Sequence, residues 1–323
     1  MRAFVTGGTG FLGTHLVTAL AARGDQVTCL VRSPAKAALR GWSGVRLVRG
    51  DLDDAAALRE GCAGADVIYH LAGLIAARNP AEFMRANRDG TAKVLAAAVA
   101  QPPRRFVLVS SIAAAGPTVP GVAIDETRPP QPVTPYGRSK LAGEQLLLNA
   151  PFPWTIVRPP VVYGEWDEAM LRVFKLAKGG IVPLFGDGSQ ELSVIYGGDV
   201  ADALVAAATS ERTAGRVYFA THAAVTTARR LALAVGHAVG KTPRFLPLPV
   251  PVARAALWTV GSLAGLVGRA TLISSERSAE FLAPAWTCRA DALRADAGWQ
   301  ARVDLETGLA RTAAWYRREG WLA

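Results

Sequence analysis

Short apolar runs alternate with longer segments of helical periodicity through the first half of the chain. Five of these runs are short enough for buried strands: 2–6, 26–31, 45–48, 66–70 and 104–110. Segments with the apolar spacing of a helix separate them, the longest at 79–100. Strands that alternate with helices predict an α/β fold built on a doubly wound parallel sheet with right-handed crossovers.

The pattern loosens after residue 164. We expect a helix at 165–178 and another at 199–208, a strand at 216–220, and amphipathic helices at 289–297 and 304–318, whose Trp299, Trp315 and Tyr316 serve packing. We predict two parts, 1–164 and a smaller, mostly helical substrate-binding part over 165–323. The segment 192–240 is expected to pack with the first part.

Glycines gather where the first apolar run ends. Gly7, Gly8, Gly10 and Gly13 follow that run and open a helical pattern. A backbone without Cβ can approach a diphosphate closely, and the amides and dipole of a helix start favour negative charge. The order of strand, turn and helix predicts a dinucleotide-binding Rossmann domain over 1–164. The turn residues assigned to the cofactor are Gly7, Gly10, Phe11, Leu12 and Gly13.

The residue types after the second apolar run bear on the choice of cofactor. An acidic side chain about 20 residues past the glycines accepts the ribose 2′-hydroxyl of NAD. This chain has no Asp or Glu between Gln26 and Gly50 and carries Arg32 at the end of the run. Arg32 can pair with a 2′-phosphate, so NADP(H) is expected in preference to NAD(H). The alternatives are NAD(H) and a solvated basic loop.

Two further strand ends carry candidate cofactor contacts. Asp51-Leu52 follows the third run, and Leu71-Ala72-Gly73 follows the fourth. Because the carboxyl ends of parallel strands face the ligand crevice, Asp51 is expected to reach the adenine amine, with Ala72 and Gly73 near the pyrophosphate or ribose. His70 is expected to end a buried strand rather than to catalyse.

Tyr136 and Lys140 stand four residues apart at the head of a predicted helix, downstream of Ser110-Ser111. Residues at this spacing share a helix face. A phenol with a pKa of about 10 is a poor acid-base catalyst at neutral pH, but a neighbouring ammonium favours the phenolate. The pair is therefore the chemical centre that the sequence predicts.

With these motifs in place, the chain resembles the extended short-chain dehydrogenases/reductases, which include nucleotide-sugar epimerases and 3β-hydroxysteroid dehydrogenases. The resemblance runs nearly end to end and is carried by these segments: Thr6 to Gly13, Asp51-Leu52, His70 to Gly73, Asn87 with Gly90-Thr91, Ser110-Ser111, Tyr136 to Lys140, and Arg158 to Gly164.

The resemblance implies a role for each matching residue. Tyr136 exchanges a proton with the substrate oxygen, and Ser111, five residues before Gly116, hydrogen-bonds that oxygen. Lys140 holds the nicotinamide ribose and lowers the pKa of the tyrosine, while Asn87 supports the site. A last group is expected to run beside the nicotinamide: Pro159, Val161 and Val162.

Two departures from the family pattern narrow the substrate. Nucleotide-sugar members carry Asn at the place of Val161 and Arg at the place of Leu192, and both serve the substrate's diphosphate. Aliphatic side chains leave phosphates uncompensated, so we expect an apolar substrate. The segment from Ser110 to Pro117 also resembles steroid dehydrogenases and lipid-ketone reductases.

We therefore expect an NADP(H)-dependent oxidoreductase that interconverts a ketone and a secondary alcohol on a lipid or sterol-like substrate. Reduction of 3-oxo-ceramide, the reaction of bacterial ceramide reductases, is the most specific form of this expectation. The alternatives are a nucleotide-sugar epimerase or dehydratase that retains its cofactor, and a non-catalytic cofactor-binding subunit.

Composition limits the partners. Lys and Arg total 36 against 26 Asp and Glu, a formal charge of +10 that suits anionic partners. These basic residues are spread along the chain, so no nucleic-acid partner is expected. Cys29, Cys62 and Cys288 lack the spacing of a zinc site or disulfide framework and are expected as buried thiols, with no metal bound. The immediate entry into a strand favours a cytoplasmic protein. A monomer or a homodimer is expected, the latter by analogy with the superfamily that the chain resembles, in which helix pairs often form dimers.

A late apolar stretch over 245–273 allows a membrane contact. Three prolines precede a charge-free run of fourteen residues from Ala255 to Gly268, flanked by Arg254 and Arg269. The run is too short to span a bilayer. It can rest on the inner face of the membrane, cover an apolar pocket, or form an ordinary helix of the substrate-binding part. The large side chains concerned are Leu257, Trp258, Leu263, Leu266 and Val267.

Overall fold

Seven parallel strands form the central sheet of the protein, whose computed structural model describes residues 1–266 and 278–322, with the backbone alone for 261–266. The strands are β1 (Arg2–Thr6), β2 (Gln26–Val31), β3 (Arg46–Arg49), β4 (Val67–His70), β5 (Arg105–Val109), β6 (Trp154–Arg158) and β10 (Arg216–Phe219). Their spatial order is β10-β6-β5-β4-β1-β2-β3. This order confirms the predicted doubly wound sheet, and it reverses between β1 and β4, where such sheets bind ligands.

Side chains alternate across the sheet, as the period of a strand requires. In β1, Ala3 and Val5 join one core cluster with Leu16 and Val200, whereas Phe4 joins a second cluster with Ile68 on the opposite face. The strands are apolar on both faces because helices cover both. This explains why the sequence shows continuous apolar runs here rather than alternation.

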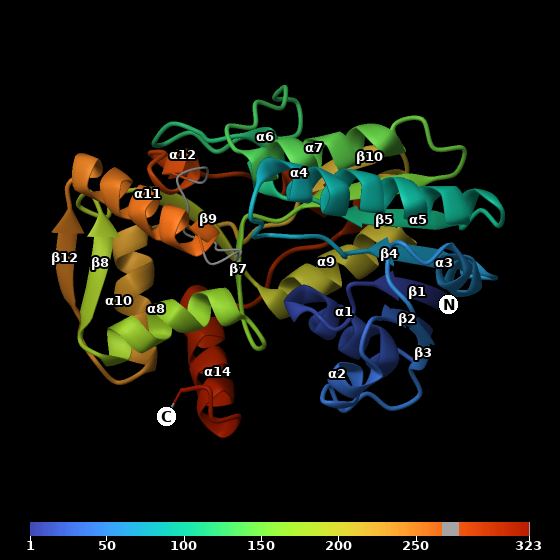
Figure 1. Cartoon of the computed structure of the whole chain (residues 1–323), viewed down its shortest axis with the longest axis horizontal. Helices are drawn as coiled ribbons and strands as arrows, with labels where there is room; N and C mark the ends of the chain where they lie inside the picture. The colour runs from blue at the N-terminus through green and yellow to red at the C-terminus, as the bar shows by residue number, and fades with distance from the viewer. Residues whose placement is uncertain (267–277, 323) are drawn as a thin grey trace.

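Helices form a layer on each face of the sheet (Figure 1). On one face α1 (Phe11–Ala22) packs beside α9 (Gly197–Thr209). On the other lie α3 (Ala55–Cys62), α5 (Gly90–Val99) and α7 (Pro135–Leu147). Short helices complete this half: α2 (Pro34–Ala38), α4 (Pro80–Phe83) and α6 (Ile112–Ala115). The helix predicted over 79–100 is present but is interrupted by a π-helical turn at Met84–Asp89.

The later part of the chain contains two small sheets that the sequence did not predict. One joins β7 (Val161–Tyr163), β9 (Glu191–Tyr196), β11 (Val225–Thr227) and β13 (Ala285–Trp286); the other pairs β8 (Ile181–Phe185) with β12 (Arg244–Leu248). The helices around them are α8 (Glu168–Lys178), α10 (Ala228–Ala238), α11 (Val250–Leu266), α12 (Ser278–Phe281), α13 (Asp291–Ala297) and α14 (Leu305–Arg318), with a 3₁₀ turn at Glu211–Thr213. Trp299, Trp315 and Tyr316 are buried, as predicted.

The segment 192–240 contributes to both halves. Its strand β10 pairs with β6 at the edge of the large sheet, and its helix α9 packs on α1. Its helix α10 instead contacts α8 and α14. The chain thus returns to the nucleotide-binding sheet after it has begun the second part.

The stretch over 245–273 begins with a strand and continues into a helix. Residues up to Leu248 form strand β12, and α11 starts at Val250, so Arg254 lies inside the helix rather than before it. Proline is tolerated in the first turn of a helix because those amides have no partner within the helix, which explains why Pro251 does not delay its start. Residues 267–277 lie outside the description.

Candidate functional site

Two positions in the glycine turn between β1 and α1 leave no room for a side chain. Gly7 has a φ of +77°, and a Cβ there would lie 2.6 Å from the amide nitrogen of Ala72. At Gly13 a Cβ would lie 2.1 Å from the carbonyl oxygen of Gly7. The turn therefore passes directly over the end of β4, and α1 packs tightly against the turn.

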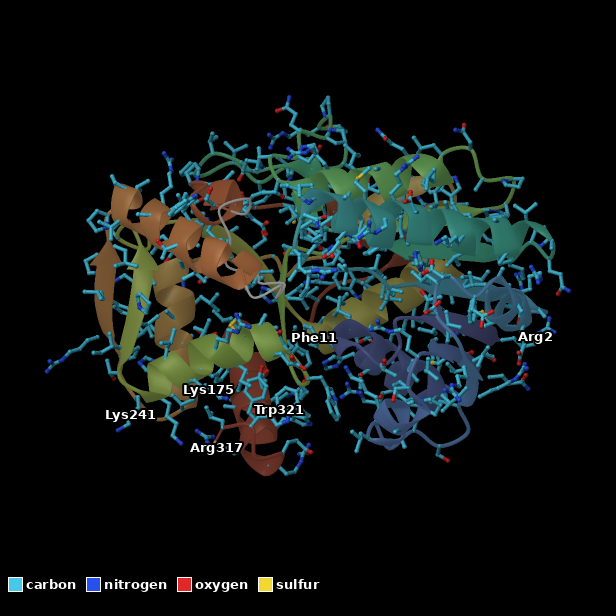
Figure 2. The ribbon with its side chains drawn as sticks, viewed as in Figure 1. Arg2, Phe11, Lys175, Lys241, Arg317 and Trp321 are labelled. Carbon is cyan, nitrogen blue, oxygen red and sulfur yellow. The ribbon has the colours of Figure 1, made fainter. Side chains whose placement is uncertain are left out.

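The start of α1 fits a phosphate group. Its N-cap residue is Gly10, so no side chain caps the first-turn amides, which include those of Phe11 and Leu12. Such amides bind anions at helix starts. Phe11, labelled in Figure 2, is the first residue of this helix, and its ring also packs against Gly164 and Gly197 at the junction of the two parts.

Arg32 follows β2 directly and is solvent-exposed. Within the described ranges, its side chain makes no hydrogen bond or ion pair, which leaves the guanidinium available to a ligand phosphate. Asp51 follows β3 and is exposed, with one carboxylate oxygen accepting the amide of Asp53 at 2.8 Å. Leu52 is partly buried and packs near Gly90.

Lys140 lies where β4 and β5 end. Its Nζ donates a hydrogen bond of 2.7 Å to the carbonyl of Val109, the last residue of β5. A Cβ on Gly73 would approach this Nζ to 3.8 Å and the side-chain oxygen of Asn87 to 2.5 Å. Lys140, Asn87 and Gly73 are thus neighbours, although the sequence separates them widely.

Asn87 is held in place by three hydrogen bonds. Its Oδ1 accepts from the amide of Leu74 at 2.8 Å, and its Nδ2 donates to the carbonyl of Leu74 at 3.0 Å and to the hydroxyl of Ser139 at 2.9 Å. It lies in the π-helical turn, a feature that recurs at functional sites. The residue therefore ties the loop after β4 to helix α7.

Ser111, the N-cap of α6, and Tyr136 of α7 stand at the starts of two helices that pack closely on each other. Ser111 caps α6 by accepting the amide of Ala113 at 3.1 Å, and Ala113 packs with Tyr136 and Phe83 in one buried cluster. A Cβ on Gly137 would lie 2.2 Å from the carbonyl oxygen of Ala113. This contact lets the start of α7 reach the loop that carries Ser111.

Ser110 has a different role from its neighbour. Its hydroxyl donates to the Glu144 carboxylate, which also accepts two hydrogen bonds, of 2.9 and 2.6 Å, from Arg158. All three side chains are buried. This network fixes α7 against β5 and β6, so the Ser110 hydroxyl serves packing between these elements.

Burial dominates the electrostatics of the site. It lowers the pKa of Lys140 to about 8, although the nearby charge of Glu144 acts in the opposite direction. Burial also lowers the pKa of His70 to about 3, and the charge of Lys140 adds to this shift. His70 is neutral at physiological pH and ends a buried strand between the hydroxyls of Thr6 and Thr91.

The segment after β6 borders the same region. The carbonyl of Pro159 accepts the amide of Ile112 at 3.0 Å, next to Ser111. Val161 and Val162 then form β7, which pairs with β9. Leu192 of β9 is 8% exposed, and its side chain packs in the core of the second part.

Sequence reasoning missed several residues that organise the site. Ser139 orients Asn87, and the carbonyl of Val109 holds Lys140. The only signal in the sequence for this role of Ser139 was its polar side chain inside the segment Tyr136 to Lys140. Within residues 1–266 and 278–322, no group of three potential metal ligands is found.

The fold and this arrangement define an NAD(P)-dependent dehydrogenase/reductase. The chain belongs to the NAD dependent epimerase/dehydratase family, whose model matches residues 3–220. It is 34% identical over 321 residues to a ceramide reductase of Caulobacter vibrioides, covering 98% of this chain and 95% of that one.

Two further similarities extend over nearly the whole chain. A 4-hydroxy-2-methyl-3-oxo-4-farnesyl-3,4-dihydroquinoline-1-oxide ketoreductase of Stigmatella aurantiaca is 35% identical over 317 residues, covering 96% of this chain and 95% of the relative. The structure of a Thermus thermophilus UDP-glucose 4-epimerase in complex with NAD superposes with a TM-score of 0.80 at 25% identity, covering 98% of this chain and 99% of that one.

Proposed function

We propose that this enzyme uses NADP(H) to interconvert a ketone and a secondary alcohol on an apolar, lipid-like substrate, and that 3-oxo-ceramide is the first substrate to test. The observations that support the proposal are that Lys140 and Asn87 are neighbours beside the loop after β4, and that α6 and α7, at whose starts Ser111 and Tyr136 stand, pack closely on each other. The relatives named ceramide reductase and farnesyl-dihydroquinoline-oxide ketoreductase support a ketone on an apolar molecule.

Each side chain has a defined task in this proposal. Nicotinamide, when bound, supplies or accepts the hydride at its C4. The Tyr136 hydroxyl gives its proton to the substrate oxygen during reduction, and the Ser111 hydroxyl donates a hydrogen bond to that oxygen. Lys140 binds the nicotinamide ribose, and its positive charge favours the phenolate that Tyr136 leaves behind. Asn87 and Ser139 keep the loop after β4 in register with α7.

Cofactor choice is assigned to Arg32. Its exposed guanidinium at the end of β2 suits a 2′-phosphate, whereas an acidic residue would accept the 2′-hydroxyl of NAD. The glycine turn and the first-turn amides of α1 suit the pyrophosphate of either cofactor. NADPH is therefore expected to bind more tightly than NADH.

The proposed substrate class follows from aliphatic side chains at two positions. Val161 and Leu192 offer no charge to a diphosphate, and Leu192 is packed against Trp286 in the core of the second part. A sugar nucleotide would leave its phosphates without cationic partners there. An apolar substrate has no such cost.

The test measures NADPH and NADH oxidation by the purified protein with 3-oxo-ceramide in detergent, beside conversion of a UDP-sugar. We expect NADPH-dependent reduction, loss of activity in Tyr136→Phe, and a reduced preference for NADPH in Arg32→Ala. Arg49→Ala, a change at the exposed last residue of β3, is the matched control. UDP-sugar turnover without ketone reduction would instead favour an epimerase, and full activity in Tyr136→Phe would contradict the mechanism.

A further inference from the structure

The outer surface of β12 and the first half of α11 exposes an unusual amount of apolar side chain. From Val250 to Val260, only Ala253 and Leu257 are buried. Trp258 is 62% exposed, Val252 is 52% exposed, and Leu246 of β12 is 53% exposed. In Figure 1, β12 and α11 lie together at one end of the molecule. We call the exposed side chains of residues 244–260 the β12–α11 face.

The helix lacks the polar side that a surface helix normally presents to water. Ala253 and Leu257 are four residues apart, so they mark one stripe that faces the protein. At 100° per residue, the opposite side carries Pro251, Ala255, Trp258 and Thr259, of which only Thr259 is polar, and its hydroxyl donates to the carbonyl of Ala255 within the helix. A helix whose exposed surface is mostly apolar belongs in an apolar environment, which the protein itself supplies only along the buried stripe.

The charge around this face has one sign. Residues 212–275 contain no Asp or Glu and eight Lys or Arg. Lys241, Arg244 and Arg254 are exposed within or beside the face. Figure 2 shows Lys241 at the outer end of the second part, pointing into solvent. In the adjoining strand β8, the 55% exposed Ile181 pairs with Arg244, so apolar and basic side chains alternate here.

We propose that the β12–α11 face docks on the surface of an anionic lipid bilayer. Trp258, Leu246 and Val252 enter the interfacial region, and Arg244 and Arg254 lie against lipid phosphates. Apolar area combined with basic charge is what an interfacial helix needs, because one weak signal gives only marginal binding. A docked enzyme would meet its apolar substrate in the lipid phase, and in this respect the proposal rests on the proposed function.

A second copy of the chain is a poorer occupant. Two copies pairing through this face would bring like-charged arginines together, and each copy carries a net charge of +10. A transmembrane anchor is a separate matter: none of the helices in the described ranges is long and apolar enough to cross a bilayer. The proposed contact is therefore peripheral.

The test uses flotation of the purified full-length protein with vesicles. One set is phosphatidylcholine alone, and the other contains about one third phosphatidylglycerol. We expect binding to the anionic vesicles, with affinity falling as salt is raised, and much weaker binding to phosphatidylcholine. No binding to either set would overturn the proposal.

Matched variants separate this face from the rest of the surface. Trp258→Ser should weaken binding about tenfold through lost apolar burial. Arg254→Gln should weaken it about fivefold, and the loss should shrink at high salt. The controls are Leu148→Ser, 57% exposed at the end of α7, and Arg46→Gln on β3, which should bind like the unchanged protein. Equal weakening by the controls would contradict the assignment of this face.

Two further readouts distinguish the other outcomes. A dimer in size-exclusion chromatography that Trp258→Ser dissociates, without vesicle binding, would make the face a self-association surface and overturn the proposal. Reduction of a water-soluble ketone is measured in the same variants and should be unchanged. Vesicle binding without any ketone reduction would refute the proposed function and leave the docking surface standing.

Discussion

The guanidinium of Arg40 lies 3.9 Å from the ring centre of Trp166, and its Nη2 donates a hydrogen bond of 2.7 Å to the carbonyl of Thr9. Trp166 has a φ of +72°, and the centre of its ring lies 4.5 Å from the centre of the Trp315 ring in α14. One side chain thus joins the glycine turn to the aromatic cluster of the second part. The position of the turn depends on a contact that crosses between the two parts.

We predict that Arg40→Met lowers the free energy of unfolding by about 1 to 3 kcal/mol, because it removes a charged hydrogen bond and a cation–π contact. NADPH binding should weaken with it, since Thr9 lies in the turn. Urea unfolding and cofactor fluorescence measure the two effects. Arg46→Met removes an exposed ion pair with Glu60 and should cost less than about 1 kcal/mol. Equal losses in both variants would contradict the special position of Arg40.

Gly7 and Gly24 offer a comparison in which the backbone strain is matched. The φ angle is +77° at Gly7 and +80° at Gly24. A Cβ at Gly7 would lie 2.6 Å from the backbone nitrogen of Ala72, whereas a Cβ at Gly24 would have no other atom within 4 Å. Gly24→Ala should therefore cost about 1 kcal/mol and leave NADPH binding intact. Gly7→Ala should displace the turn and abolish binding. Similar cofactor affinities in the two variants would show that the turn tolerates a side chain.

The pH dependence of ketone reduction should follow Lys140. Its pKa of about 8 means that the ammonium is charged below this pH and neutral above it. Because the proposed role of the charged form is to hold the ribose and to favour the Tyr136 phenolate, kcat/KM for reduction should fall as the pH rises through about 8. In Lys140→Arg, whose guanidinium stays charged, any remaining activity should persist to higher pH. A wild-type profile that stays flat up to about pH 10 would refute this role.

The buried ion pair between Glu144 and Arg158 should be sensitive to loss of one partner. Arg158→Met leaves the carboxylate buried without its cation and should cost about 3 to 5 kcal/mol. Adding Glu144→Leu removes the stranded charge and should recover part of that loss, although the Ser110 hydroxyl then loses its partner. Thermal and urea unfolding of the single and double variants measure this. A double variant less stable than Arg158→Met would contradict the explanation.

An exposed ion pair gives the control for this series. The Nη2 atom of Arg289 lies 2.6 Å from the Oδ2 atom of Asp125, and the Arg289 side chain is 52% exposed. Arg289→Met should change stability by less than about 1 kcal/mol. The contrast tests burial, because the charges and the contact distances of the two pairs are alike.

Local patterns account for what the sequence predicted well. The turn from β1 into α1 is dictated by neighbouring glycines, and the shared face of Tyr136 and Lys140 follows from helix geometry. Strands β1 and β2 were placed at their observed ends because apolar runs bounded by turn residues mark them clearly. These features depend on residues only a few positions apart.

Long-range pairing accounts for what was missed. Strand β13 has two residues, Ala285 and Trp286, and exists because it pairs with β9. A segment so short has no period to detect. The hydrogen bond between Asn87 and Ser139 joins residues 52 positions apart. No distinctive amino-acid pattern marks the π-helical turn that carries Asn87. Such features are decided by packing rather than by local preference.

Strand β10 pairs with β6, although the residues of β10 come more than fifty positions after those of β6 in the chain. Until the polypeptide is synthesised as far as Phe219, the apolar strand β6 has an open edge of unpaired amides and carbonyls. Open edges recruit strands from other molecules. A fragment ending at Gly164, although it holds every proposed catalytic residue, should therefore aggregate during expression, whereas a fragment that includes β10 would have this edge closed.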